Sequence, residues 1–255
     1  MSGKNYTKYF LFHSISMKMN LEGIFNILFP SRCINCEKRI EGQSVICAEC
    51  FGRVNLNKTL FCGQCRARLP EGKKICHRST PYILGAAINY EDGAIKNMIH
   101  GLKFRFLKKS GEALGRLLVR YTDSVAELKK FGIGKKEEIV VIPIPLSKKR
   151  ERERGFNQSE IIARVFADHY NFDLALDCLV RTRDTVPQSE TGNVAERLRN
   201  AQGCFSVVNE KPLRDKKVAV LIDDVITSGA TILAAAEELK RSGAKHILAL
   251  VVAKA

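Results

Sequence analysis

The stretch VAVLIDDVITSGATI at residues 218–232 constrains the fold of this 255-residue chain more than any other feature. Residues 218–222 form the apolar run expected of a parallel strand that is buried on both faces. Two adjacent acids, Asp223 and Asp224, stand where that strand is expected to end, and a Thr/Ser/Gly loop and a helix start follow. Ligands of open α/β sheets bind beyond the carboxyl ends of the strands. The stretch therefore predicts an α/β sheet with a polar site at this edge.

The loop after the two acids has the composition of an anion-binding turn. Gly229 lets the backbone turn close to an anion, which hydroxyls and free N–H groups at the helix start can bind. An ordinary strand–turn–helix with an Asp cap is the alternative, but adjacent acids repel each other and a cap needs only one of them.

This stretch resembles the phosphoribosyl pyrophosphate (PRPP) motif of type I phosphoribosyltransferases. The resemblance implies that the two acids hold the ribose hydroxyls and that the loop holds the 5′-phosphate. The implied PRPP-binding residues are Asp223, Asp224, Val225, Thr227, Ser228, Gly229, Ala230 and Thr231.

The charge balance of the chain is strongly basic. Its 42 Lys and Arg residues exceed its 27 Asp and Glu residues, which gives a net charge of +15. Such a surplus favours polyanionic partners such as nucleic acid, although a generally basic protein is the alternative. The length suffices for a full core, in one large domain or in a large domain with a small one.

The N-terminus shows neither a signal peptide nor a membrane span. The chain has no run of about 18 apolar residues, and the apolar piece near Phe10 lacks a following cleavage site. Residues 1–23 are expected to be a disordered extension, or part of an over-long start with Met17 or Met19 as the true first residue. A cytoplasmic location is expected.

Seven of the nine cysteines lie between residues 33 and 76. Cys33-x-x-Cys36 and Cys47-x-x-Cys50 are two pairs separated by ten residues, and each pair can bind one side of a tetrahedral zinc. Disulfides suit a cytoplasmic chain less well, while an iron–sulfur cluster and metal-free thiols are the rivals. Four thiolates leave no open position for water, so the predicted zinc is structural. We expect a Cys-rich zinc-binding domain over residues 24–80.

A second cluster contains Cys62, Cys65, Cys76 and His77. Ser79 stands where a further cysteine would complete the pattern, so His77 is the candidate fourth ligand. A decayed site with leftover thiols is the alternative. Few large apolar residues lie between the clusters, so we expect this domain to need metal to fold.

Apolar periodicity predicts alternating strands and helices over residues 81–255. The expected strands, besides 218–222, are 81–90, 139–146, 177–182, 205–208 and 246–252, the last of which closes the sheet; the expected helices are 92–102, 110–130, 157–169 and 231–241. Gly243 is expected just after the last helix as its C′ residue. The final strand–helix–strand unit should have the usual right-handed crossover.

Two basic segments are candidates for anion binding. Lys103 and Arg105 interleave with Phe104 and Phe106, a composition that suits a nucleic-acid surface, or else a helix end with solvated cations. SKKRERERGFNQS at 147–159 reads as a basic loop with five cations against two acids. Arginine forks match phosphate oxygens, so this loop is a candidate pyrophosphate or DNA clamp, with a solvated charge run as the alternative. Its candidate residues are Lys149, Arg150, Arg152, Arg154 and Gln158.

Together these motifs resemble the ComF family over residues from about 24 to 255. The resemblance rests on the paired CxxC head, IHGLKF, IPIPLSKKRERERGFNQS, RTRDTVPQS and LIDDVITSGAT. It implies a zinc finger on a type I phosphoribosyltransferase body, and a link to natural competence, the uptake of single-stranded DNA into the cytoplasm. Ser79 departs from the family pattern.

Two classes of function follow from the resemblance. One is an enzyme that transfers phosphoribose from PRPP, with Mg²⁺ holding the pyrophosphate, although no general base is identified. The other is a PRPP-sensing module that binds single-stranded DNA and works with DNA-uptake helicase and recombination proteins. A nucleobase-salvage transferase is a third interpretation.

Overall fold

The computed structural model describes residues 31–40, 44–70, 76–77, 79–105, 107–130, 136–183 and 200–255. The predicted extension over 1–23, Phe106 and the polar segment 184–199 lie outside the described residues. None of the described helices is long and apolar enough to cross a membrane.

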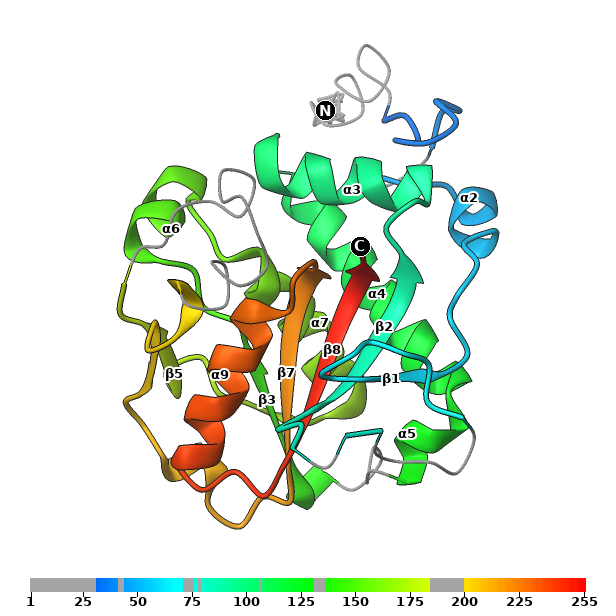
Figure 1. Cartoon of the computed structure of the whole chain (residues 1–255). Coiled ribbons are helices and arrows are strands. Elements are labelled where there is room, and N and C mark those ends of the chain that lie inside the picture. Colours follow the sequence, from blue (N-terminus) through cyan, green and yellow to red (C-terminus); the bar gives the residue numbers. More distant parts are fainter. Residues whose placement is uncertain are drawn as a thin grey trace, which may run out of the picture.

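The body is built on a six-stranded, mostly parallel sheet (Figure 1), which confirms the α/β prediction. In spatial order its strands are β1 (Leu60–Cys62), β2 (Ile83–Asn89), β8 (His246–Lys254), β7 (Val218–Ile226), β3 (Ile139–Pro143) and β4 (Asp173–Leu174). Only β1 runs antiparallel to its neighbour. The prediction that 246–252 closes the sheet is wrong. β8 lies in the middle, because β2 and β1 from earlier in the chain add beyond it.

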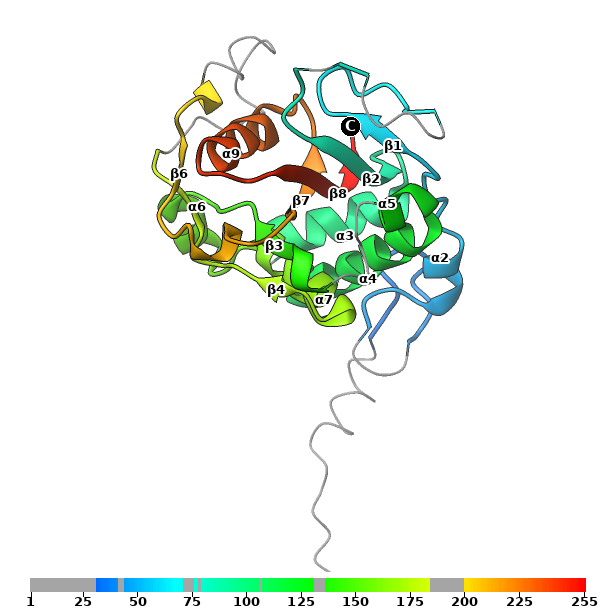
Figure 2. The same ribbon diagram turned by 90° about the horizontal axis from the view of Figure 1, so that it is seen from below.

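Helices cover both faces of the sheet (Figure 2). One face carries α3 (Gly93–Phe104), α4 (Lys108–Ser124) and α7 (Gln158–Tyr170), and the other carries α9 (Ala230–Arg241) with a small antiparallel sheet of β5 (Leu179–Arg181) and β6 (Phe205–Val207). Along β7, Val220 and Ile222 pack toward the first group, while Ala219 and Leu221 pack toward the second. This burial on both faces is what the apolar run at 218–222 predicts.

Two predicted segments differ in the structure. The helix expected over 110–130 is two helices, α4 and α5 (Ala126–Lys130), because buried Val125 between them has extended backbone. The basic segment expected as a loop is a helix, α6 (Lys148–Arg154). Ser147 caps its start, Gly155 ends it at φ +70°, and the Lys, Arg and Glu residues between them are good helix formers. Short elements complete the description: α2 (Ala48–Gly52) and the 3₁₀ turns Lys136–Glu138 and Lys211–Leu213.

Candidate functional site

The two acids lie on a part of β7 that extends past its neighbour β3. The β3–β7 pairing ends at Pro143 and Ile222, whereas β8 continues to pair with β7 as far as Ile226. The prediction that the strand ends at the acids is therefore wrong, since pairing with β8 carries it through them. On the β3 side, however, Asp223 and Asp224 stand beyond the last strand pair. That is the crevice position in which α/β sheets bind ligands.

Each acid is held by a side chain from a different helix. Ser159 Oγ, at the start of α7, donates to Asp223 Oδ1 at 2.8 Å. Lys103 Nζ, from the end of α3, lies 2.8 Å from Asp224 Oδ2. The Asp224 side chain is only 4% exposed, so this ion pair is shielded from water. Backbone N–H groups of Asp224 and Val225 donate to Asp223 Oδ1 and Asp224 Oδ1.

The environment of Asp223 favours its neutral form. Burial and the adjacent Asp224 charge raise the pKa of Asp223 to about 7, although the Ser159 hydrogen bond and the Lys103 charge act against this. The site thus holds one carboxyl that changes charge near neutral pH and one that is paired with an ammonium. A ligand that donates hydroxyl hydrogen bonds to Asp223 would favour its ionised form.

The sequence did not identify Lys103 and Ser159 as partners of the acids. Lys103 was predicted to lie on a nucleic-acid surface or at a helix end with solvated cations, but its side chain is 22% exposed and pairs with Asp224, whereas Phe104 beside it is 63% exposed. Nothing in the sequence indicated that the end of α3 would reach Asp224. For Ser159, nothing in the sequence indicated which acid it would reach.

The segment at the α6–α7 turn joins the basic helix to the acids. Arg154 Nη1 donates to Gln158 Oε1 at 2.8 Å, and Asn157 caps α7 while its Nδ2 donates to the Ile144 carbonyl at 3.0 Å. Burial lowers the pKa of half-buried Arg154, and the nearby charges of Asp224 and Asp223 act in the opposite direction. Of the predicted clamp residues, Arg154 and Gln158 thus lie near the acids. The remaining three are on α6, where Lys149 and Arg152 are exposed and Arg150 is partly buried.

The loop between β7 and α9 has the geometry of an anion-binding turn. Gly229 is the N-cap of α9 at φ +80°, a conformation that glycine adopts without strain. Ser228 Oγ accepts a hydrogen bond from the Ala230 N–H at 3.4 Å. Ala230 is buried, and Thr227, Ser228 and Thr231 are partly exposed. Free N–H groups at a helix start attract anions, so this loop can hold a phosphate.

The first cysteine segment, residues 31–40 with 44–54, gathers the predicted zinc ligands. The sulfur atoms of Cys33, Cys36, Cys47 and Cys50 all lie within 4.8 Å of one another. Although burial acts to raise it, backbone N–H groups of Cys36 and Cys47 lower the pKa of the Cys33 thiol to about 6. Thiolates are the form that binds metal, so this cluster fits a structural zinc.

The second cysteine segment, residues 60–70 with 76–77 and 79–82, forms a similar cluster. Its ligand atoms, from Cys62, Cys65, Cys76 and His77, also lie within 4.8 Å of one another. His77 Nδ1 is 3.4 Å from Cys62 Sγ, whose pKa falls to about 6 because hydrogen bonds from Cys65 and His77 outweigh burial. Ser79 instead donates to Gln64 Oε1 at 3.2 Å. This geometry fits a second, three-cysteine and one-histidine site.

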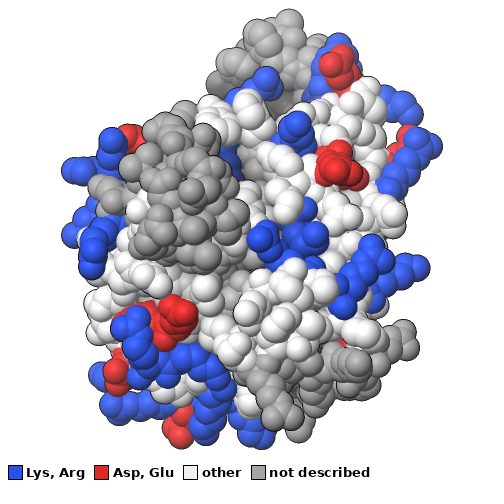
Figure 3. Space-filling view, viewed as in Figure 1, with Lys and Arg blue, Asp and Glu red and all other residues white. Residues whose placement is uncertain are grey.

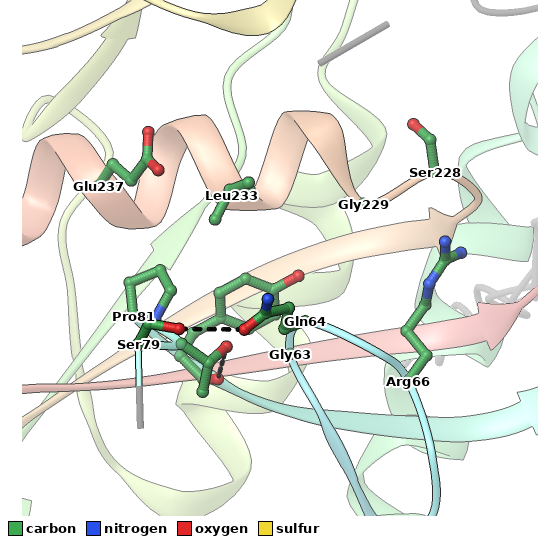
Figure 4. Close-up of a pocket in the computed structure, with 11 residues that line it drawn as sticks. Gly63, Gln64, Arg66, Ser79, Pro81, Ser228, Gly229, Leu233 and Glu237 are labelled. Carbon is green, nitrogen blue, oxygen red and sulfur yellow. Dashed lines mark hydrogen bonds between the residues drawn. The ribbon is translucent and has the colours of Figure 1, made fainter. Parts of the chain in front are cut away.

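The first cysteine segment lies on the sheet face that carries α3 and α4, whereas the second extends the sheet edge and borders the α9 side (Figure 2). The first packs beside α4, where Arg120 donates to the Phe51, Gly52 and Val54 carbonyls. The second contributes β1 to the sheet and borders a pocket of about 380 Å³ beside α9 (Figure 4). Arg66 from this segment points toward the phosphate loop and donates to the Thr227 carbonyl. Nothing in the sequence indicated that contact.

A basic groove is formed by residues near α6 and β5. A pocket of about 420 Å³ is lined by Ser147, Lys148, Val180, Arg181, Thr182 and Arg183. It lies between the start of α6 and β5, next to the carboxyl end of β3. Figure 3 shows Lys and Arg side chains spread over much of one face of the molecule, with fewer acidic side chains among them. The groove therefore carries three cationic side chains, those of Lys148, Arg181 and Arg183.

Two family matches cover these sites. Residues 24–80 match the family described as Double zinc ribbon domain, and residues 148–255 match the family described as Phosphoribosyl transferase domain. The first contains both cysteine clusters, and the second contains the acids, the phosphate loop and α6. These matches confirm the predicted zinc-binding and phosphoribosyltransferase-like parts of the chain.

Similar proteins carry names from DNA uptake and use. The DNA utilization protein YhgH of Escherichia coli (strain K12) is 28% identical over 224 residues, which cover 86% of this chain and 94% of the relative. Competence protein F of Haemophilus influenzae is 25% identical over 235 residues, or 89% of this chain and 98% of the relative. Competence protein ComFC of Streptococcus pneumoniae is 31% identical over 217 residues, or 80% of this chain and 86% of the relative. On this similarity, with both family matches, the chain belongs to the ComF family of competence and DNA utilization proteins.

Proposed function

We propose that this protein binds PRPP with Mg²⁺ at the β7 acids and the phosphate loop, and binds single-stranded DNA along its basic surface during DNA uptake. The observation that carries the proposal is the pair of buried carboxylates placed directly before an anion-binding helix start. A sugar with a 5′-phosphate presents hydroxyl donors and an anion in that same order. The work takes place in the cytoplasm, where incoming strands meet helicase and recombination proteins.

In this proposal Asp223 and Asp224 accept hydrogen bonds from the ribose hydroxyls. Thr227 to Thr231 surround the 5′-phosphate with N–H and hydroxyl donors. Arg154 lies near the acids and offers a guanidinium fork to the pyrophosphate, with Arg150 on the preceding turn. Lys103 keeps the net charge of the acid pair low until a ligand arrives.

The residues present fit a magnesium ion brought in with pyrophosphate. Mg²⁺ prefers oxygen ligands, usually one or two carboxylates together with phosphate oxygens and water, and the crevice offers two carboxylates. The ion would neutralise charge on the pyrophosphate as it leaves the sugar. Transfer breaks the bond between C1 and the pyrophosphate oxygen and forms a bond from C1 to an acceptor nucleophile. The same pocket without an acceptor would act as a PRPP sensor.

Single-stranded DNA is the second ligand in the proposal. The groove beside α6, the exposed Lys149 and Arg152, and the net charge of +15 support it. The names of the relatives, which refer to competence and DNA utilization, point in the same direction. Phosphate contacts of this kind weaken steeply as salt rises.

Calorimetry on the full chain tests the proposal. PRPP with Mg²⁺ should bind the wild type, and Asp223→Asn/Asp224→Asn should remove that binding, while Asp168→Asn on the exposed surface of α7 should not. Single-stranded DNA should bind in a salt-dependent manner and survive the double acid change. Lys149→Ala/Arg152→Ala should weaken the binding of single-stranded DNA without weakening the binding of PRPP. Absence of PRPP heat in the wild type would contradict the pocket assignment.

A further inference from the structure

The two cysteine segments contain the same backbone turn. In each, a CxxC pair is followed by a residue whose N–H donates at 2.9 Å to the carbonyl of the first cysteine, Glu37 to Cys33 and Arg66 to Cys62. Both Glu37 and Arg66 have φ of 59°. A residue other than glycine seldom adopts positive φ, so the turn itself fixes this conformation. The side chain after the second cysteine therefore leaves the turn in a defined direction.

That direction leads to different surroundings in the two segments. Glu37 is exposed, and its carbonyl accepts a hydrogen bond from Arg32 within the same segment. Arg66 is partly buried and reaches across 161 positions of sequence to donate to the Thr227 carbonyl. Only in the second segment does the turn present a side chain to the phosphate loop.

Arg66 and Tyr82 approach the loop together. Arg66 lines the pocket beside α9 with Ser228 and Gly229, as Figure 4 shows. A Cβ on Gly229 would lie 3.5 Å from the Tyr82 hydroxyl, so this tyrosine also packs close to the loop. The loop is therefore bordered by a cation and a buried ring that both come from the second cysteine segment.

The chemistry of Arg66 suits a second role beyond holding the backbone. A guanidinium carries several N–H donors, and one terminal nitrogen donates to Thr227. The others match the oxygens of a phosphate, to which charge-assisted hydrogen bonds are short and strong. The contact also holds Thr227 in place before a ligand binds, which reduces the ordering cost of binding.

We propose that Arg66 is a phosphate-binding residue of this site, supplied by the second cysteine segment, so that the zinc-held turn completes the binding site for the 5′-phosphate. The inference rests on the proposed PRPP site and adds a residue from outside the phosphoribosyltransferase match. The metal then has a function in ligand binding, because it fixes the turn that aims Arg66.

Calorimetric titration with ribose 5-phosphate tests the role of Arg66. Arg66→Ala should weaken binding by about tenfold or more, the loss expected for a charged hydrogen bond, and Arg66→Lys should recover part of it. Arg68→Ala, which removes a cation from an exposed position two residues further along the same segment, should change the affinity less than about twofold. Titration with pyrophosphate and Mg²⁺ should be unaffected by Arg66→Ala, since that group binds beside Arg154.

Zinc content and the acid variant separate the outcomes. Arg66→Ala with full zinc and wild-type ribose 5-phosphate affinity would overturn the proposal. So would an equal loss for ribose 5-phosphate and pyrophosphate, or a loss of zinc, because either shows a structural role. If the wild type binds ribose 5-phosphate and Asp223→Asn/Asp224→Asn does not, the proposed site stands whatever Arg66 does. If the wild type binds neither ribose 5-phosphate nor PRPP, the proposed function itself has failed.

Discussion

The two cysteine segments have the same turn but different relations to the rest of the protein. The first packs against the α3 and α4 side of the core through Cys33, Ile46 and Val54, and three of its carbonyls accept hydrogen bonds from Arg120 of α4. The second is part of the sheet through β1 and reaches the phosphate loop through its own Arg66. A repeated metal-binding unit has thus been used once as a support and once as part of the candidate ligand site. The residue after the second cysteine, Glu37 or Arg66, marks the difference.

Removing one metal site at a time is the most severe test of this comparison. Cys33→Ser/Cys36→Ser and Cys62→Ser/Cys65→Ser should each reduce zinc from two ions to one per chain, since each cluster has its own ligands. Only the second change should abolish measurable ribose 5-phosphate binding, because it frees the turn that carries Arg66. Metal analysis with calorimetry measures both. An equal loss of ribose 5-phosphate binding in the two variants would contradict the proposed difference between the two cysteine segments.

Exchanging the marker residues is the next test. Arg66→Glu places an anion beside the phosphate loop and should weaken ribose 5-phosphate binding by about a hundredfold, more than removal of the cation alone. Glu37→Arg in the first segment should leave the affinity within about twofold of the wild type. A large effect of Glu37→Arg would mean that net charge, and not position, decides the affinity.

A pH series separates Arg66 from the acids. Asp223, with a pKa near 7, should lose its charge as the pH falls from 8 to 6, which weakens ribose binding by about tenfold. Arg66→Ala should lower the affinity by the same factor at every pH, because arginine stays charged. Asp223→Asn should remove this part of the pH dependence and serves as the reference for the titration of the ligand itself.

The same titration affects the ligand-free protein. A carboxyl whose pKa is raised on folding binds more protons in the native state. The contribution of Asp223 to stability is therefore complete below about pH 4 and is lost as the pH rises through about 7. Denaturant midpoints that rise over this range relative to Asp223→Asn would contradict the assigned environment.

The smallest effect concerns the attachment of the first segment. Arg120→Ala removes donors to three carbonyls and should lower the free energy of unfolding by about 1 to 3 kcal/mol, since the site is partly open to water. Ribose 5-phosphate binding should not change. Urea denaturation and calorimetry measure the two effects, and a coupled loss of affinity would show that the first segment also supports the site.

Sequence patterns predicted the parts of this molecule that depend on short-range chemistry. Residues close together in sequence determine the buried strand at 218–222, the loop around Gly229 and the cysteine clusters. All three are present in the structure. Residues 148–154 were predicted to be a basic loop on the basis of their charge. They form a helix, because Lys, Arg and Glu also have high helix propensity. Strand order also escaped prediction, since the position of β8 depends on β2, which lies far away in sequence.

Contacts between distant segments were the main part of the candidate site that the sequence could not supply. Ser159 with Asp223, Lys103 with Asp224 and Arg66 with Thr227 each join residues far apart in the chain. A single sequence has no signal for such pairs, because many serines and cations have similar local surroundings. The acids and the loop could be predicted, but the side chains that form hydrogen bonds or ion pairs with them could not.

The position of β1 has a consequence for solubility. β2 is an apolar seven-residue strand, and the segment from Asn57 to Cys62 occupies the backbone groups on its outer side. An uncovered strand of this kind pairs readily with other chains. β1 itself is only three residues long and ends at Cys62, a candidate zinc ligand, so a metal bound there would hold the cover in place. A chain without zinc at this site would expose the unpaired backbone groups of β2. We therefore expect chelation or cysteine oxidation to cause aggregation of the protein.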